Sequence, residues 1–130
     1  MKEEQLVIYV DDDPDDREIM QESFDALDSF RLLSFVNGKE FLEYLNKRQL
    51  PLPCMVILDI NMPFFSGVDI LRIMKSDPLH KMLPVAMFTT SKSPMDELQC
   101  KQYGAVAIFI KPASFKEAVA VSQKLIQYCE

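Results

Sequence analysis

The chain has 130 residues, of which 48% are hydrophobic, and its 14 basic and 20 acidic side chains give a net charge of −6. This length suits one domain with a single sizeable core, and the hydrophobic content excludes a disordered polyelectrolyte. The negative charge opposes nucleic-acid binding, and the longest apolar stretch, AVAIFI at 105–110, is too short for a membrane span, so we expect neither kind of partner.

Five short runs of aliphatic and β-branched residues predict β-strands. They occupy positions 6–10, 31–36, 55–58, 85–88 and 107–110. The segments between them repeat apolar residues every three or four positions, which is typical of helices. Such positions are Met20, Phe24 and Leu27 after the first run, Phe41, Leu42 and Leu45 after the second, and Val68, Leu71 and Met74 after the third.

A last helix is expected after the fifth strand, with Phe115, Val119, Leu125 and Ile126 near one face and Ser114 as its cap. The order is therefore βαβαβαβαβα. Regular alternation of apolar strands with helices predicts an α/β fold, in which helices cover both faces of a parallel sheet. We see no linker or internal repeat, so one domain is expected.

Polar side chains follow four of the five predicted strands. Asp11, Asp12 and Asp13 follow the first, Asp59 the third, Thr89 and Thr90 the fourth, and Lys111 the fifth. Ligands of open parallel sheets bind at the carboxyl ends of the strands. If these four strands lie side by side, carboxylates, a hydroxyl and an ammonium group meet at one edge.

This mixture of groups suits phosphoryl chemistry with Mg²⁺. Several carboxylates offer the hard oxygen ligands that Mg²⁺ prefers, and the ion removes the repulsion between them. Lys111 and Thr89 are the groups expected around a transferred phosphoryl group, whose oxygens need positive charge and hydrogen-bond donors. Asp59 is then a candidate nucleophile that forms an aspartyl phosphate.

Four motifs, VDDDP, VILDINMPFFSG, PVAMFTTS and AIFIKPAS, occur in this order and at spacings that resemble the receiver domain of bacterial two-component response regulators. DPDDRE, LDINMP, MKSDP and TTS resemble most the stand-alone branch similar to cyanobacterial phytochrome response regulators. The resemblance covers essentially the whole chain. It implies a flavodoxin-like (βα)5 fold, a doubly wound five-stranded parallel sheet in order 2-1-3-4-5, and a single receiver domain over 1–130 with no output domain.

The resemblance assigns roles around the metal and the phosphoryl group. Asp59 would be the phosphoacceptor. Asp12, Asp59 and the backbone carbonyl of Asn61 would hold Mg²⁺, with Mn²⁺ as an alternative, and Asp11 would contact the metal through water. Thr89 would be the switch hydroxyl, Thr90 would offer a backbone N–H, and Lys111 would bind the phosphate. Asn61 and Ser91 would tune dephosphorylation.

One position departs from the family. The switch strand commonly carries Tyr or Phe where this chain has Ile108, with Phe109 beside it. Alternation along a strand should point Ile108 and Phe109 to opposite faces, which puts aromatic coupling to the switch hydroxyl in doubt. In the loop after the third strand, at least one ring of Phe64 and Phe65 is expected to pack inward.

The implied function is that of a two-component response regulator. It would accept a phosphoryl group from a phosphohistidine of a sensor histidine kinase or a histidine phosphotransfer protein, and would signal by contact with an unidentified downstream protein. Such a protein promotes its own phosphorylation and dephosphorylation rather than acting as a turnover enzyme. It would be a monomer or a phosphorylation-dependent dimer.

Two rival functions stay open. A haloacid dehalogenase-type phosphatase also uses an aspartyl phosphate, but it needs D-x-D where this chain has Asp59, Ile60 and Asn61. An unphosphorylated interaction module with the receiver fold is the other, and Ile108 leaves it open.

The acidic run has simpler interpretations as well. Asp13, Asp15 and Asp16 are interpreted as solvated acids at a helix start, where they interact well with the helix dipole. An EF-hand calcium loop would begin at Asp11, but Asp16 then occupies the position that needs Gly.

The three cysteines, at 54, 100 and 129, form no C-x-x-C pair and are interpreted as ordinary small apolar residues. Together with an amino terminus that lacks the apolar core of a signal peptide, this favours the reducing cytoplasm. His80 has no neighbours that bind metals and is expected to be exposed to solvent.

Overall fold

The computed structural model describes residues 4–48 and 51–129. Strands and helices alternate as the sequence predicts, and each predicted strand is found to within one residue at either end. The elements are β1 (Gln5–Val10), α1 (Pro14–Asp25), β2 (Phe30–Phe35), α2 (Gly38–Asn46), β3 (Met55–Asp59), α3 (Gly67–Lys75), the 3₁₀ turn η1 (His80–Met82), β4 (Val85–Thr89), α4 (Pro94–Gln102), β5 (Ala107–Ile110), α5 (Phe115–Leu125) and η2 (Ile126–Cys129).

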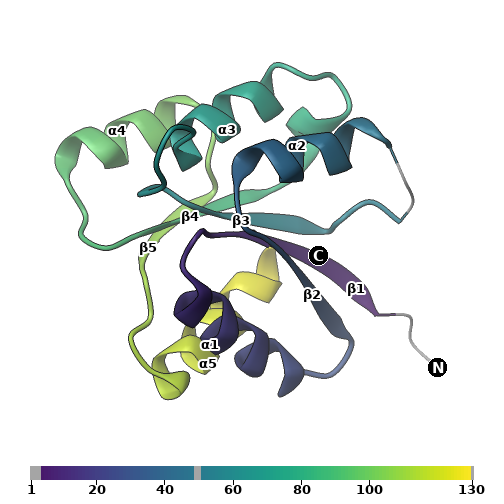
Figure 1. The fold of residues 1–130 in the computed structure, drawn as a ribbon, viewed down its shortest axis with the longest axis vertical. Coiled ribbons are helices and arrows are strands. Elements are labelled where there is room, and N and C mark those ends of the chain that lie inside the picture. Colours follow the sequence, from purple (N-terminus) through teal and green to yellow (C-terminus); the bar gives the residue numbers. More distant parts are fainter. Residues whose placement is uncertain (1–3, 49–50, 130) are drawn as a thin grey trace.

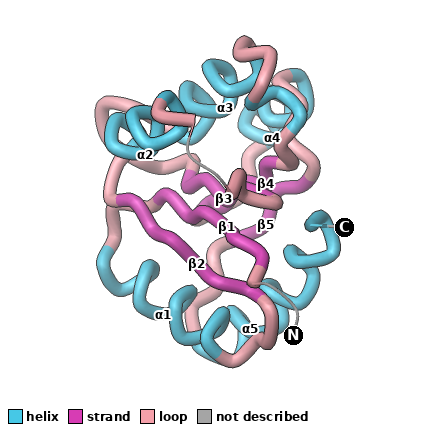
Figure 2. The backbone as a smooth tube through the Cα atoms, turned by 90° about the vertical axis from the view of Figure 1, so that its right-hand side faces the viewer, coloured by secondary structure: helices cyan, strands magenta, loops and turns pink. Residues whose placement is uncertain are grey.

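The five strands form one parallel sheet in the order β2-β1-β3-β4-β5, which confirms the predicted fold class. Helices α2, α3 and α4 cover one face of the sheet, and α1 and α5 cover the other (Figures 1 and 2). The register brings the carboxyl ends of the central strands together, because Val10 pairs with Leu58, Asp59 with Phe88, and Thr89 with Ile110.

The strands supply two core layers, one on each side of the sheet. On β1, Ile8 and Val10 pack beneath α2 and α3, whereas Val7 and Tyr9 pack toward α1 and α5. On β5, Ile108 packs in the first layer and Phe109 in the second, so the predicted alternation is confirmed. Burial on both faces explains why the strands read as continuous apolar runs.

Side-chain caps start the five α-helices of the described residues. The residues that cap them are Asp13, Asn37, Ser66, Ser93 and Ser114, each of which accepts a hydrogen bond from a backbone N–H of the first turn. Ser114 accepts from the Glu117 N–H at 3.2 Å, as predicted. These caps satisfy donors that have no partner inside a helix and fix where each helix leaves the sheet edge.

The inward face of α5 differs from the prediction. Ala118, Ser122 and Leu125 are buried, whereas Phe115 is 48% exposed. The buried face contains a polar residue because the Ser122 hydroxyl lies 2.9 Å from that of Ser23 on α1. A search for apolar spacing could not identify this face, because Ser122 is polar and is buried through its contact with Ser23.

The interpretation of Cys54 and Cys129 as ordinary apolar residues was wrong. The two form a disulfide with a Cα–Cα distance of 4.8 Å, which joins the residue before β3 to η2. They are 75 residues apart in sequence, so only the return of the chain after α5 brings them together. Cys100 is free and buried on α4, as expected of a small apolar side chain.

The expectation for His80 was also wrong. This residue begins η1 and is only 3% exposed. Its backbone N–H donates to Asp77 Oδ1 at 3.3 Å, and its Nδ1 lies 3.6 Å from Asp77 Oδ2. The tight turn after α3 therefore directs the imidazole inward, which a loop-like sequence does not reveal.

Within the described residues, no helix is both long and apolar enough to cross a bilayer.

Candidate functional site

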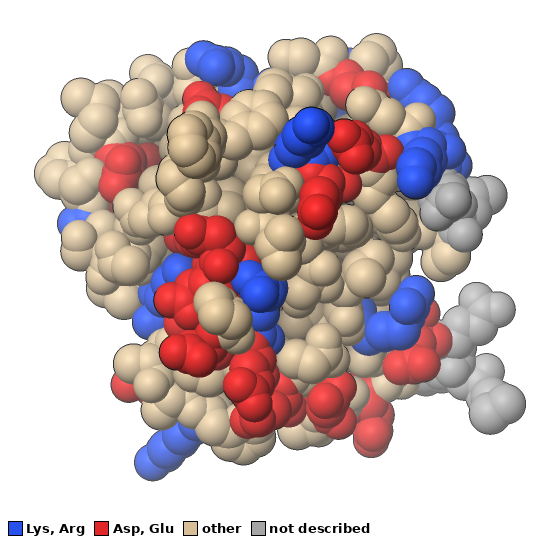
Figure 3. Space-filling view, viewed as in Figure 1, with Lys and Arg blue, Asp and Glu red and all other residues tan. Residues whose placement is uncertain are grey.

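The candidate site lies at the carboxyl ends of β1, β3, β4 and β5. Asp11, Asp59 and Thr89 are fully buried there, and the side chain of Lys111 is 12% exposed. Asp and Glu side chains also gather over α1, beside this edge (Figure 3). The fold thus brings together the polar residues that follow the four predicted strands.

Lys111 is the centre of an ionic cluster. Its Nζ lies 2.9 Å from Asp11 Oδ2, 2.8 Å from Asp16 Oδ2 and 3.2 Å from Asp59 Oδ2. Burial lowers the pKa of Lys111, but the contacts with Asp16, Asp11 and Asp59 outweigh this effect and raise it overall. The ammonium group therefore stays charged and partly neutralises three carboxylates.

Asp59 ends β3 with its two oxygens in different surroundings. Oδ1 accepts a hydrogen bond from the Asn61 N–H at 3.0 Å, whereas Oδ2 has only the ionic contact with Lys111 and no hydrogen bond from a described residue. Burial is the main cause that raises the pKa of Asp59 to about 6, and the negative charge of Asp11 is the second. The hydrogen bond from Asn61 and the positive charge of Lys111 lower this pKa, but by less.

Asp11 is held more firmly than Asp59. Its Oδ1 accepts from the Asp13 N–H at 2.9 Å, and its Oδ2 accepts from the hydroxyl of Tyr9. Burial and the nearby Asp11 charge raise the pKa of Tyr9 well above its ordinary value, so the phenol remains a donor. The sequence did not indicate this role, because Tyr9 has the place of a core residue in an apolar strand.

Asp16 is the main correction within the site. It was interpreted as a solvated acid, yet its side chain is only 25% exposed and it binds Lys111. Side chains of a first helical turn tilt toward the helix amino terminus, which here points at the strand ends. Asp13 caps α1 and Asp15 is exposed, as expected.

Thr89 faces the side chain of Asn61. Its hydroxyl donates to Ser91 O at 2.9 Å and lies 3.3 Å from Asn61 Oδ1. The Thr90 N–H donates to the same Asn61 oxygen at 3.1 Å, and the Thr90 hydroxyl also lies 3.3 Å from it. One amide oxygen thus connects the loop after β3 to the loop after β4.

The loop between β3 and α3 exposes one aromatic ring and buries part of another. Phe64 has a φ of 64° and is fully exposed, while Phe65 packs against the core layer under α2 and α3. The prediction that at least one ring packs inward is confirmed. Positive φ is uncommon for a bulky residue, and here this backbone conformation directs the Phe64 ring away from the core.

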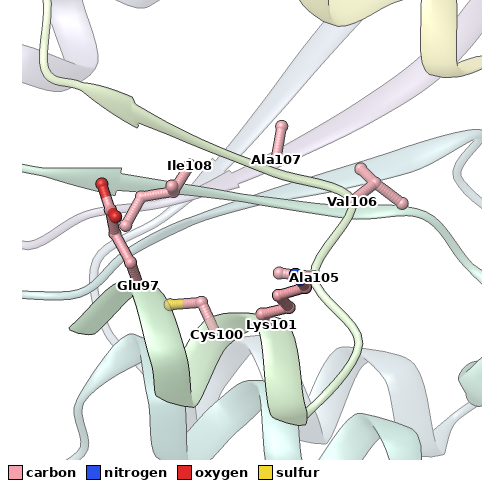
Figure 4. Close-up of a pocket in the computed structure, with 7 residues that line it drawn as sticks. All are labelled: Glu97, Cys100, Lys101, Ala105, Val106, Ala107 and Ile108. Atoms are coloured by element: carbon pink, nitrogen blue, oxygen red, sulfur yellow. The ribbon is translucent and has the colours of Figure 1, made fainter. Parts of the chain in front are cut away.

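Ile108 lies outside the ionic cluster. It lines a pocket of about 450 Å³ between α4 and β5, together with Cys100 and residues 105–107. Figure 4 shows Cys100 on the helix side of this pocket and Ile108 on the strand side. No aromatic ring occupies the switch-strand position in this fold.

The family model of the response regulator receiver domain matches residues 7–123. The chain belongs to this family. A curated relative is response regulator Rre1 of Synechocystis, which is 32% identical over 97% of this chain and 53% of its own length. The transcriptional regulator NtrC of Escherichia coli is 31% identical over 95% of this chain and 25% of its own length. This receiver domain therefore spans about half of Rre1 and a quarter of NtrC.

Solved structures of response regulators share the fold. The phosphorylated cyanobacterial phytochrome response regulator RcpA has a TM-score of 0.87 at 22% identity, covering 96% of this chain and 93% of RcpA. The Mn²⁺-bound form of Rcp1 has a TM-score of 0.83 at 22% identity, covering 95% and 92%. The bacteriophytochrome response regulator AtBRR has a TM-score of 0.78 at 27% identity, covering 98% and 93%.

The receiver domain offers a set of oxygens suited to a divalent cation. One carboxylate oxygen from each of Asp11, Asp12 and Asp59 lies within 4.8 Å of the others, with Asp12 exposed and the other two buried. Asp59 Oδ2 accepts no hydrogen bond from a described residue and is thus available as a ligand. An all-oxygen donor set fits the hard cations that receiver domains bind.

Proposed function

We propose that this receiver domain accepts a phosphoryl group on Asp59 from a phosphohistidine of a sensor histidine kinase or a histidine phosphotransfer protein. A carboxylate oxygen of Asp59 bonds to phosphorus, the phosphorus–nitrogen bond breaks, and the histidine keeps the electron pair. The observation that carries the proposal is Asp59 Oδ2, a buried oxygen without a hydrogen bond from the described residues and 3.2 Å from Lys111 Nζ.

The donor set supports Mg²⁺ as the cation of this reaction, with Mn²⁺ as an alternative. Asp12, Asp59 and the backbone carbonyl of Asn61 would hold it, and Asp11 would contact it through water. When bound, the ion would neutralise carboxylate and phosphoryl charge. Asp12 is exposed at the edge of the cluster, which gives the cation a way in from solvent.

The remaining residues act on the phosphoryl group itself. Lys111 would neutralise one phosphoryl oxygen, while the Thr89 hydroxyl and the Thr90 N–H would donate to others. Thr89 and Thr90 now share Asn61 Oδ1, so phosphorylation requires them to exchange this acceptor for a phosphoryl oxygen. This exchange would couple Asp59 to the loop after β4.

Three positions would set the lifetime and reach of the signal. Asn61 and Ser91 would tune the attack of water on the acyl phosphate, and Thr89 already bonds to both. With Ile108 at its position, that face of β5 would have no aromatic ring to follow the movement of Thr89. We infer that movement of the β4–α4 loop carries the signal instead.

The output would be contact with a downstream protein in the cytoplasm. The protein would act as a monomer or as a phosphorylation-dependent dimer. It would promote its own phosphorylation and dephosphorylation rather than turn over a separate substrate. The family and the placement of Asp59, Thr89 and Lys111 at one edge support the self-phosphorylation part of this proposal.

Intact mass after incubation with acetyl phosphate tests the proposal. We expect a gain of one phosphoryl group that requires Mg²⁺ and is absent in Asp59→Asn. Asp15→Asn is the matched control: it removes the same charge from an exposed position on α1 and should leave the gain unchanged. A Mg²⁺-binding protein that gains no phosphoryl group would instead be an interaction module.

A further inference from the structure

Three carboxylates surround the ammonium group of Lys111 in this structure. It carries three N–H groups, and three carboxylate oxygens, from Asp11, Asp16 and Asp59, lie within 3.2 Å of Nζ. A phosphoryl oxygen that is to bind Lys111 therefore competes with these carboxylates for the ammonium group. Which carboxylate leaves determines how readily the lysine becomes available.

The three carboxylates differ in how firmly they are held. Asp11 is fully buried and also accepts bonds from the Tyr9 hydroxyl and the Asp13 N–H. Asp59 is fixed at the buried end of β3 and becomes the phosphoryl carrier itself. Asp16 lies in the first turn of α1 with a side chain 25% exposed, and Lys111 is its carboxylate's one hydrogen-bond partner among the described residues.

Asp16 is thus the carboxylate that can leave. A change of rotamer would take its head group into water, where a carboxylate is well solvated, while Asp11 has no such path. Its contact of 2.8 Å is as close as the 2.9 Å contact of Asp11, so Asp16 competes for the ammonium group while it stays bound.

We propose that Asp16 is a positioning residue that competes with the phosphoryl group for Lys111. This inference rests on the proposed function of Asp59. In the unphosphorylated protein Asp16 holds the ammonium group, and it releases Lys111 when the phosphoryl group arrives. Its negative charge also repels the incoming phosphoryl oxygens. Asp16 therefore lowers the affinity of the site for a phosphoryl group.

Binding of beryllofluoride, a non-reactive mimic of a phosphoryl group, tests this role in the intact chain. The dissociation constant would be measured by titration calorimetry at fixed ionic strength and saturating Mg²⁺. We expect Asp16→Asn to bind beryllofluoride about tenfold more tightly than the wild type. Asp15→Asn removes the same charge one residue away without freeing Lys111, and should stay within about twofold of the wild type.

Two further readouts separate competition from a general effect on the fold. Asp16 is not a proposed metal ligand, so Mg²⁺ affinity without beryllofluoride should change equally in Asp16→Asn and Asp15→Asn. Asp16→Glu keeps the charge and should restore affinity close to that of the wild type. Equal or weaker beryllofluoride binding by Asp16→Asn, compared with Asp15→Asn, would overturn the proposal. If the wild type itself binds Mg²⁺ but not beryllofluoride, the proposed function of Asp59 fails with it.

Discussion

Gly67 lies directly against the backbone of Asp59. A Cβ on Gly67 would be 2.3 Å from the carbonyl oxygen of Asp59 and 2.8 Å from its carbonyl carbon. Asp59 cannot move away easily, because it ends a buried central strand and pairs with Phe88. The start of α3 is therefore packed onto the residue that we propose as phosphoacceptor, and only glycine fits at this contact.

Gly67→Ala should destabilise the fold and displace the end of β3. Overpacking against a backbone that cannot shift costs about 1–3 kcal/mol in the free energy of unfolding. Gly38→Ala is the matched control, because its new Cβ would meet the side chains of Ile70 and Phe65, which can adjust. Urea denaturation compares the two variants. Equal losses of stability would contradict the proposed contact.

The amide of Asn61 should hold the loop after β4 in place. In Asn61→Ala the backbone carbonyl stays, but the acceptor shared by Thr89 and Thr90 is lost. Loss of a hydrogen bond worth about 1 kcal/mol should make the Thr90 amide exchange with solvent several-fold faster. Hydrogen exchange by NMR without metal measures this.

The Asp96 amide provides an internal reference for that experiment. It donates to the Ser93 hydroxyl at 3.1 Å, at the start of α4, and none of the hydrogen bonds among the described residues joins it to Asn61. Its exchange rate should be unchanged in Asn61→Ala. An unchanged rate at Thr90, or an equal acceleration at both amides, would show that Asn61 does not act locally on Thr90.

The site residues at strand ends could be predicted from the sequence because their positions are set by local pattern. An apolar run fixes the strand, and the next residue must emerge at the sheet edge, as Asp11, Asp59 and Lys111 do. Strand order then decides which ends meet, and alternation of strands with helices limits that order to few possibilities. The two core layers follow from the same alternation.

The missed features depend on contacts between distant segments. Asp16 forms an ion pair with Lys111, which is 95 residues away in sequence, and Cys54 forms a disulfide with Cys129, which is 75 residues away. No local pattern distinguishes Asp16 from Asp15, since both are acids in the first turn of α1. Successive positions of a helix point about 100° apart around its axis, so Asp15 and Asp16 face different directions. Only the packed structure shows that Asp16 is the one that faces Lys111, which follows β5.

Reduction should lower the thermal stability of the protein. In the chain-entropy account, a disulfide that closes a loop of 75 residues stabilises by about 4 kcal/mol, because it restricts the unfolded chain. We expect reductant to lower the melting temperature by roughly 15 °C in differential scanning calorimetry. Such bonds are uncommon in the cytoplasm, where thiols are kept reduced, so phosphorylation should be assayed in both the oxidised and the reduced form.

A double variant, Cys54→Ala with Cys129→Ala, provides the control for this measurement. It should melt at the lower temperature with or without reductant. Cys100→Ala, by contrast, should keep the full response to reductant, because Cys100 is free. A wild-type melting temperature that reductant does not change would show that Cys54 and Cys129 are not joined.

Cys100 should react with iodoacetamide only slowly in the folded, oxidised protein. Burial, and next the charge of Asp96, raises the pKa of this thiol from 9.0 to about 11. A raised pKa keeps the thiol protonated to higher pH, and only the thiolate is an effective nucleophile. The rate, followed by intact mass, should rise about tenfold for each pH unit between about pH 8 and about pH 10.

The control is the protein unfolded in urea with its disulfide intact. Its Cys100 should react readily at about pH 8, and its reaction rate should level off near the ordinary thiol pKa. A rate that levels off near that value in the folded protein would mean that burial does not protect Cys100.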